Sequence, residues 1–387
     1  MAAAGTAQVH QTAARGPLTG VRVVELAGIG PAPFAGMLLA DLGADVVRVD
    51  RPGGTDLALD PVHDLCGRGK RSVLVDLKSP GGPEQLLDLV ARADLLVEGF
   101  RPGVAERLGV GPEPCLARNP RLVYGRMTGW GQDGPLAARA GHDVAYIART
   151  GILGMIGGPD AAPAIPANIL GDFAGGSLYL VVGLLAALHH ARGTGAGQVV
   201  DAAIVDGAAH LSTMIHGMLA AGIWQDRRGD NLLDGGCPFY GCYRTADGGH
   251  MAVGALERRF YDEFVHLLGL DGELPDRDDQ SRWDELRAAV AERFATRTRA
   301  EWTSLFADSD ACVAPVLSLR EAPGDPHLAA RGTFVHHAGI TQPAPAPRFS
   351  DTPAAVRSAP ARPGADTAGV ARDWHVPGLT AADPVRP

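Results

Sequence analysis

Residues 21–50 read VRVVELAGIGPAPFAGMLLADLGADVVRVD and predict a strand, a helix and a second strand in that order. The run 21–26 is apolar enough for a buried strand, and Pro31 and Pro33 suit the first turn of the following helix. Gly43 ends that helix before the next apolar run, 45–50. A βαβ unit of this kind builds a parallel sheet, so the segment indicates an α/β fold.

The glycines of this unit are similar to a dinucleotide-binding fingerprint but do not complete one. The third glycine of Gly-x-Gly-x-x-Gly falls on Pro33, which has no backbone N–H to offer a pyrophosphate. Lys70 does not belong to a phosphate-binding P-loop either, because Asp64 replaces the first glycine of that motif and Arg71 replaces its Ser or Thr. We therefore expect neither a nicotinamide site nor a P-loop.

Strands and helices continue to alternate along the first half of the chain. Further strands are predicted at 72–76, 94–98, 122–126 and 198–204, and helices at 83–92, 102–108, 173–188 and 205–222. This pattern predicts a large domain with an open, Rossmann-like sheet over residues 17–225. Ligands of such sheets bind at the carboxyl ends of the strands.

A second pattern begins after a polar stretch at 226–236, which we interpret as a linker. A smaller α+β domain is predicted for 237–339, with its elements at 239–245, 251–254, 256–268, 283–294, 299–306 and 312–316. Asp247 and Gly248 favour a hairpin turn between its first two strands. Residues 1–16 are expected to form a disordered lead, and 340–387 to return to the large domain, with a Pro-rich extended part at 342–363.

Composition narrows the class of protein. A hydrophobic content of 46% and a charged content of 20% are typical of a globular protein, and the net charge of −9 argues against nucleic-acid binding. The five cysteines are scattered without a Cys-x-x-Cys pair, which favours a reducing compartment and no zinc site. The apolar run 173–188 is short for a bilayer, and residues 1–16 lack the apolar core of a signal peptide. We expect a cytoplasmic protein without membrane insertion.

Two titratable residues stand out. His142 lies in Gly141-His142-Asp143, and Asp172 directly precedes the longest apolar run of the chain. There Asp172 is expected to cap a buried helix and to stay ionised, with the backbone N–H groups of that helix start as a candidate oxyanion site. Two bases facing one carbon suit removal and return of a proton. The alternative is a helix-capping aspartate and an unrelated loop histidine.

Neighbouring residues leave alternatives open. Asp143 either orients His142 or is a solvated neighbour. Tyr146, one helical turn from His142, is interpreted as packing. Met214 and Met218 are expected in the core, although their helical spacing also suits contact with an acyl chain.

Several segments together resemble family III CoA-transferases (the CaiB/BaiF superfamily) and, within it, the α-methylacyl-CoA racemase branch. The resemblance runs from about Pro17 to Phe349 and is carried by Pro17–Leu26, Asp41–Pro52, Val97–Gly103, Thr128–Pro135, Gly141–Asp143 and Gly197–Ala202. It implies a Rossmann-like large domain, a small domain, and two interlocked subunits with the active site between the large domain of one and the small domain of the other.

The resemblance also implies the chemistry. Asp172 matches the nucleophile of the transferases and the acid/base aspartate of the racemases. His142, and Glu257 at the start of a small-domain helix, match the racemases, whereas the glycine-rich loop of transferases is not present at 253–257. The expected reaction is epimerisation of 2-methyl-branched acyl-CoA thioesters by 1,1-proton transfer through an enolate. The alternative is a transferase that moves CoA between carboxylic acids through a covalent Asp172 intermediate.

By the same resemblance, a set of residues near strand ends and around His142 is expected to bind CoA. They are Arg51, Val75, Asp76, Leu77, Lys78, Gly99, Phe100, Arg101, Arg107, Gly141, His142, Asp143, Val144, Ala145 and Tyr146. Arg68 and Arg71 are instead expected to be surface charges. CoA is part of the substrate, so no separate cofactor and no metal are expected.

Overall fold

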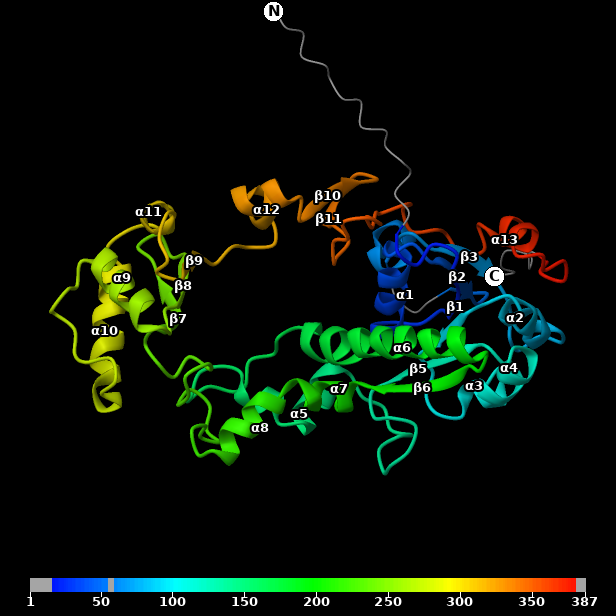
Figure 1. Cartoon of the computed structure of the whole chain (residues 1–387), viewed down its shortest axis with the longest axis horizontal. Coiled ribbons are helices and arrows are strands. Elements are labelled where there is room, and N and C mark those ends of the chain that lie inside the picture. The colour runs from blue at the N-terminus through cyan, green and yellow to red at the C-terminus, as the bar shows by residue number, and fades with distance from the viewer. Residues whose placement is uncertain (1–15, 55–58, 381–387) are drawn as a thin grey trace, which may run out of the picture. The chain divides into compact units, whose positions relative to one another are not determined.

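The computed structural model describes residues 16–54 and 59–380, and Figure 1 shows their elements. The chain divides into two compact units. The large unit comprises Met1–Thr150, Ala167–Leu211 and Gly332–Pro387, and the small unit comprises Gly151–Pro166 and Ser212–Arg331. The chain thus leaves the large unit at Leu211 rather than at 225, and the segment 151–166 groups with the small unit. Of the predicted disordered lead, 1–15 lies outside the described residues, while Gly16 is buried.

The large unit is built on a parallel sheet, as predicted. Among the described residues it has six strands in the order β3-β2-β1-β4-β5-β6, and every adjacent pair is parallel. The strands are β1 Arg22–Leu26, β2 Asp45–Asp50, β3 Arg71–Leu74, β4 Leu95–Glu98, β5 Val123–Thr128 and β6 Gln198–Ala203. The strand order reverses between β1 and β4, which is where doubly wound sheets bind ligands.

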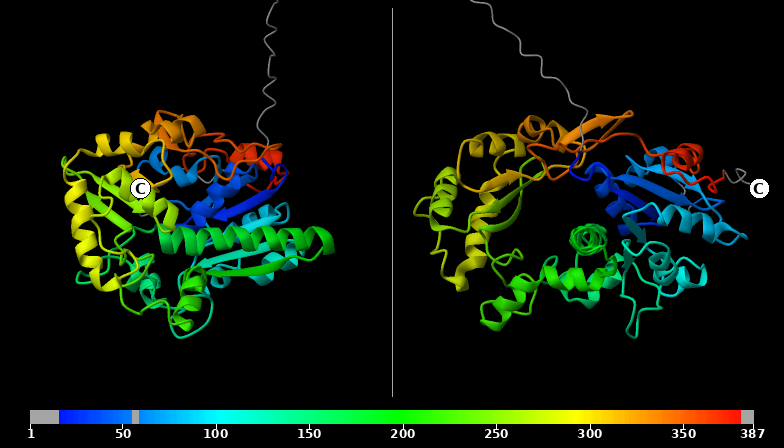
Figure 2. Two further views of the ribbon diagram at one scale, coloured as in Figure 1. Left: turned by 60° about the vertical axis from the view of Figure 1, so that its left-hand side comes forward. Right: turned by 45° about the vertical axis from the view of Figure 1, so that its right-hand side comes forward.

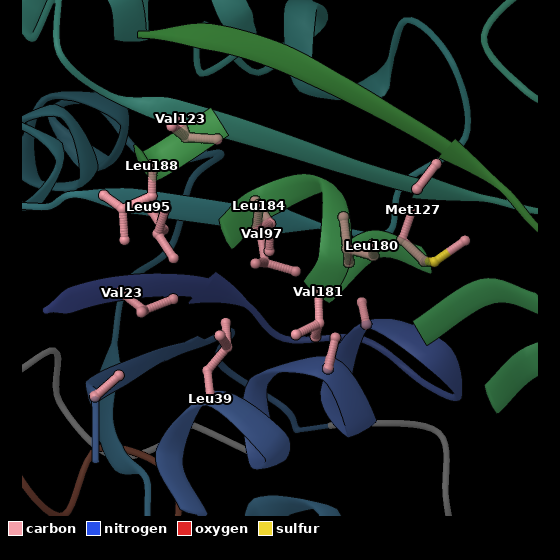
Figure 3. Packing of buried hydrophobic residues seen from close by; sticks show 14 of the residues in the cluster. Val23, Leu39, Leu95, Val97, Val123, Met127, Leu180, Val181, Leu184 and Leu188 are labelled. Carbon is pink, nitrogen blue, oxygen red and sulfur yellow. The ribbon is translucent and has the colours of Figure 1, made fainter. Parts of the chain in front are cut away.

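One face of this sheet is covered by α1 (Pro31–Asp41) and α6 (Leu178–Thr194). Figure 3 shows Leu180, Leu184 and Leu188 of α6 directed at the strands, where they share a buried cluster with Val97 and Val123. The left view of Figure 2 shows α6 lying along β5 and β6. Leucines at a spacing of four residues lie on one helix side, so α6 seals this face of the sheet.

The other face is covered by four shorter helices and has its own buried cluster. These helices are α2 (Gly82–Val90), α3 (Val104–Arg107), α4 (Pro112–Arg118) and the C-terminal α13 (Thr367–Asp373). Val24 of β1 joins this cluster while its neighbour Val23 joins the one under α6. Burial on both faces explains the adjacent apolar residues in the central strands, such as Val23 and Val24 of β1 and residues 95–97 of β4. Trp374 belongs to this cluster, so the chain does return to the large unit at its C-terminal end.

The apolar run before α6 belongs to a longer helix than the sequence indicated. A π-helical segment, η4 (Ile169–Ser177), passes directly into α6. Together they span 26 residues, which is long enough for a membrane span, and an 18-residue stretch within them has a mean hydropathy of 1.7. The expectation that this run is too short is therefore wrong as to length. Within the described part of the chain it is the one helix that passes this test, and its buried side packs against the sheet as a core helix does.

Buried ion pairs tie the elements of the large unit together. Lys70 Nζ contacts both carboxylate oxygens of Glu25 at 2.6 and 2.8 Å. Arg68, expected on the surface, is 4% exposed and pairs with Asp41 of α1 at 2.6 Å. Arg71 is half-buried and pairs with Asp45 at 2.6 Å. The prediction of surface charges at 68 and 71 is wrong, because both guanidinium groups join segments distant in sequence.

The small unit contains an antiparallel sheet and three main helices. Its strands, in the order β7-β8-β9, are Tyr240–Arg244, His250–Gly254 and Val313–Pro315, which confirms the predicted hairpin. Helices α9 (Arg258–Leu268), α10 (Trp283–Phe294) and α11 (Arg299–Phe306) pack on an aromatic core. The predicted linker 226–236 is folded around Asn231, which is 4% exposed and whose side chain donates to the carbonyls of Gln225 and Arg227.

Several elements depart from the predicted ones. The helix expected at 205–222 divides at Ser212 into α7 (Ile204–Leu211) and α8 (Thr213–Ala220). Several elements have no predicted counterpart. They are the helices α4, α5 (Asp143–Arg149), α12 (Pro326–Arg331) and α13, the hairpin of β10 (Phe334–His337) and β11 (Ile340–Pro343), and the short helices η1 (Pro61–His63), η2 (Leu65–Gly67), η3 (Ile152–Met155), η5 (Gln280–Arg282) and η6 (Ala322–Gly324).

Candidate active site

A cavity of about 270 Å³ opens at the carboxyl ends of β1, β4 and β5, within the large unit. Its walls come from Ile29 and Gly30 after β1, from Gly99–Pro102 after β4, and from Thr128–Trp130 at the end of β5. His142 and Asp172 line the same cavity. The position agrees with the general rule for α/β sheets, because it lies where the strand order reverses.

Asp172 lies inside the π-helical segment η4, so the prediction that it caps a helix is wrong. The segment begins three residues earlier, at Ile169. Tertiary contacts hold it in place: Phe173 stacks on Phe34 of α1 with ring centroids 4.5 Å apart, and Ser177 Oγ donates to the Pro31 carbonyl at 2.8 Å. π-Helical turns are rare and frequent at functional sites.

The Asp172 carboxylate faces the first turn of α1. A Cβ atom at Gly30 would lie 3.3 Å from Asp172 Oδ2, and Gly30 has a φ of 78°, which few side chains tolerate. Asn168 Nδ2 donates to the same Oδ2 at 3.2 Å. A glycine at position 30 therefore leaves room for a substrate atom beside the carboxylate.

Burial is the main influence on Asp172. It raises the pKa of the carboxyl group above its ordinary value of 3.8, and the nearby charge of Asp143 adds to that rise. The hydrogen bond from Asn168 and the imidazole of His142 act in the opposite direction. Because Asp172 lies inside a helical segment and not at its first residue, the helix-cap reason for expecting an ionised carboxylate does not apply, and the raised pKa suits a group that both accepts and returns a proton.

His142 is brought to the same cavity by a short helix. It occupies the N-cap position of α5 (Asp143–Arg149), and its carbonyl accepts the N–H of Ala145 at 2.8 Å. The imidazole is exposed and close enough to Asp172 for the two charges to interact. The structure thus places together the two residues proposed as an acid/base pair.

Asp143 adopts neither of its two expected roles. It is not solvated, since it is only 6% exposed. No hydrogen bond joins it to His142 among the described residues; instead its Oδ1 accepts the backbone N–H of Asp172 at 2.7 Å. That N–H is therefore occupied, which removes it from the predicted oxyanion site.

Tyr146 packs against the cavity wall, in agreement with its interpretation as a packing residue. A Cβ atom at Gly129 would lie 1.9 Å from its ring, and one at Gly141 would lie 2.6 Å from it. The ring also meets Trp130 edge-on at 4.7 Å. The Tyr146 ring thus requires glycine at positions 129 and 141.

The expected CoA-binding residues fall into two groups. Gly99, Phe100 and Arg101 line the cavity with Arg139, which the sequence did not single out. The loop that carries them is anchored by the buried carboxylate of Glu98, which accepts the Phe100 N–H at 2.7 Å. Two guanidinium groups thus stand at a cavity that otherwise offers a single carboxylate among its lining residues.

The remaining expected CoA contacts lie elsewhere. Arg51 donates to the Gly54 carbonyl at 2.8 Å, and Val75–Lys78 form a turn after β3 in which Asp76 accepts the Lys78 N–H. Arg107, Val144 and Ala145 are likewise not among the residues that line the cavity. A second cavity, of about 190 Å³, lies beside the carboxyl ends of β1 and β2.

Glu257 and the two methionines belong to the small unit. Glu257 is the N-cap residue of α9, its side chain is exposed, and it makes no capping hydrogen bond. Met214 is 60% exposed, and α8 has no buried residue, so the expectation that Met214 and Met218 lie in the core is wrong. The part of the chain that the structure describes has no cluster of three or more His, Cys, Asp or Glu side chains placed to hold a metal ion.

Sequence reasoning missed Asn168, which donates to the Asp172 carboxylate, and Gly30, whose missing side chain leaves space beside it. A partial signal exists for each. Gly30 follows a buried strand and precedes Pro31, and Asn168 precedes Asp172 by four residues, which is one helical turn. Neither signal identifies a carboxylate contact without the fold.

His142 and Asp172 thus line one cavity at the switch point of a parallel sheet. The family model for CoA-transferase family III matches residues 18–367, and the chain belongs to this family. It is 46% identical to the human α-methylacyl-CoA racemase over 341 residues, which cover 87% of each chain, and 46% identical to the mouse racemase over 339 residues, again 87% of each. The crystal structure of a CaiB/BaiF family protein from Brucella suis matches with a TM-score of 0.81 at 30% identity, covering 93% of this chain and all of that one.

Proposed function

We propose that this protein is an isomerase that epimerises 2-methyl-branched acyl-CoA thioesters by 1,1-proton transfer. The observation that carries the proposal is the placement of His142 and Asp172 on one cavity at the switch point of the sheet. The 46% identity to two mammalian racemases supports the substrate class.

The chemistry follows from the thioester. Its carbonyl delocalises the charge left when the α-proton is removed, so a base of moderate strength suffices if the enolate oxygen is stabilised. One of the two residues removes the proton from one face, and the other returns a proton to the opposite face. His142 is the base for one epimer and Asp172 for the other, and the roles exchange in the reverse direction. No organic cofactor is needed for these steps.

Cations around the cavity suit the charged part of the substrate. Arg101 and Arg139 line the cavity itself, and Arg51 and Lys78 follow β2 and β3 at the same edge of the sheet. Arginine and lysine are the usual partners of phosphate groups. We assign the phosphates of CoA to this edge.

We also propose a homodimer in which Glu257 joins the acid/base pair across the subunit interface. The support is family membership together with unpartnered apolar side chains on the large unit. Val182 of α6 is 66% exposed, and Leu178 and Leu211 are 45% and 46% exposed. Exposed apolar surface of this kind is typical of subunit interfaces.

The test is α-proton exchange in deuterated water with separate (R)- and (S)-2-methylacyl-CoA. Deuterium incorporation from both epimers is expected for the wild type and is expected to fall by about 10²–10⁴-fold in His142→Ala and Asp172→Ala. Glu113→Gln, an exposed first-turn acid of α4, serves as the control that retains activity.

The alternative activity gives a different result in the same experiment. If neither epimer exchanged, but CoA moved to an added carboxylic acid and hydroxylamine trapped Asp172 during turnover, the protein would be a CoA-transferase. In that reaction the Asp172 carboxylate forms a mixed anhydride with the acyl group and releases the CoA thiolate.

A further inference from the structure

The carboxylate of Asp143 is buried beside Asp172 with half of its hydrogen-bonding capacity unused. Its Oδ1 accepts the Asp172 N–H at 2.7 Å. Its Oδ2 is inaccessible to solvent and has no hydrogen-bond partner among the described residues. A buried carboxylate with one unpaired oxygen destabilises the folded state, so Asp143 lowers the free energy of unfolding at this position.

The chain is shaped to permit this contact. A Cβ atom at Gly171 would lie 2.3 Å from Asp143 Oδ1 and 3.0 Å from the Ile147 side chain. Glycine is therefore required at 171 for the carboxylate to reach the next residue's N–H. Asp143 is the first residue of α5 and His142 the residue before it. Two adjacent residues thus supply the imidazole, from His142, and the carboxylate oxygen that accepts the Asp172 N–H, from Asp143.

We propose that Asp143 is a positioning residue for the proton transfer: it holds the Asp172 backbone at a set place relative to His142, and its charge disfavours a second negative charge on Asp172. The proposal rests on the function proposed above. It concerns a residue that touches neither the reacting carbon nor the cavity, since Asp143 is not among the residues that line it.

The negative charge of Asp143 affects Asp172 separately from the hydrogen bond between the two residues. An asparagine would still offer an oxygen to the Asp172 N–H, and its amide would occupy the place of the unpaired Oδ2. What asparagine lacks is the negative charge, which raises the pKa of Asp172 together with burial. The groups that act in the opposite direction are Asn168 and His142, and the other titratable groups lining the cavity are Tyr146, Arg101 and Arg139.

Two substitutions at this position separate the two effects. In Asp143→Asn the exchange rate at the pH optimum stays within about tenfold of wild type, and the acid limb of the pH–rate profile moves to lower pH by up to about one unit. The direction follows because the pair becomes active when Asp172 loses its proton, and that loss occurs at lower pH without the neighbouring charge. In Asp143→Ala both the charge and the anchor are lost, so the acid limb moves as in Asp143→Asn and the rate at the pH optimum falls about 10²-fold.

A second variant breaks the contact while keeping both carboxylates. Gly171→Ala forces the Asp143 side chain away and is expected to lower the rate about as much as Asp143→Ala. Glu113→Gln is the control for removal of a first-turn acid charge, and it leaves both rate and profile unchanged. Circular dichroism of each variant establishes that it is folded.

The results decide between the proposals. Two results would overturn the role of Asp143 alone, provided that the wild type is active. One is an acid limb in Asp143→Asn at the same pH as in wild type, and the other is a folded Gly171→Ala variant with the wild-type rate. A wild type that exchanges neither epimer overturns the proposed function and the positioning role with it.

Discussion

Replacing Lys70 by methionine removes one half of the most deeply buried ion pair that the structure describes. The Lys70 and Glu25 side chains are 1% and 0% exposed. All three protons of the ammonium group are engaged, two by Glu25 and one by the Pro33 carbonyl at 2.8 Å. Methionine retains the apolar stem but leaves the Glu25 carboxylate without its partner.

The expected cost is about 3–5 kcal/mol, because an uncompensated charge then remains in the core. In Lys70→Met/Glu25→Gln no charge is left, and we expect most of that stability to return. Position 36 limits relaxation around the pair: a Cβ atom at Gly36 would lie 1.6 Å from Glu25 Oε2, so the carboxylate has little space in which to move.

Urea unfolding followed by circular dichroism measures these differences, with the double variant as the matched control. The penalty also depends on pH. Burial raises the pKa of Glu25 above 4.5, and the contact with Lys70 opposes that rise. Without lysine, the full penalty is present above the folded-state pKa of Glu25, and it disappears as the pH falls below the unfolded value of 4.5, because the carboxyl group is then protonated in both states.

A single variant as stable as wild type, or a double variant that recovers nothing, would refute this reasoning. So would a penalty that stays constant between about pH 8 and the unfolded pKa of Glu25.

Two further predictions concern the active site. Gly129→Ala places a Cβ atom 1.9 Å from the Tyr146 ring and is expected to displace that ring. The free energy of unfolding, measured by heat or urea, is expected to fall by about 1–3 kcal/mol, and the exchange rate is expected to fall as well. Wild-type stability together with a wild-type rate would contradict this packing of Tyr146. The acid limb of the wild-type pH–rate profile is expected above the ordinary aspartate pKa of 3.8, because burial raises the pKa of Asp172. Asn168→Ala removes a hydrogen bond to the ionised carboxylate and is therefore expected to move that limb to still higher pH. An unchanged or lower limb in Asn168→Ala would show that Asp172 is not the group that titrates there.

Local chemistry explains which elements could be predicted. The first βαβ unit, the hairpin around Asp247 and helix α10 at 283–294 were predicted because apolar periodicity and turn residues act over a few positions. Arg68 could not be placed in the same way. Its partners Asp41 and Gln342 are 27 and 274 residues distant, and an arginine is expected on the surface unless such a partner is known.

The candidate site shows the same division. His142 and Asp172 were singled out from the sequence, and a family resemblance assigned their chemistry. The π-helical turn at Asp172 was not predictable, because it depends on Phe173 stacking against Phe34, far away in the chain. Its consequence, a carboxylate whose pKa is raised rather than lowered, was therefore missed as well.

The parallel α/β class, the hairpin of the small unit and the choice of His142 and Asp172 as candidate bases could be taken from the sequence, since these depend on short-range patterns and on motifs that keep their order. Only the tertiary structure decided that Asp143 holds Asp172, that Gly30 faces its carboxylate and that Met214 is exposed. The physical reason is that burial and hydrogen bonding between distant segments set the charge and position of a side chain. Neither is encoded by the residues that flank it.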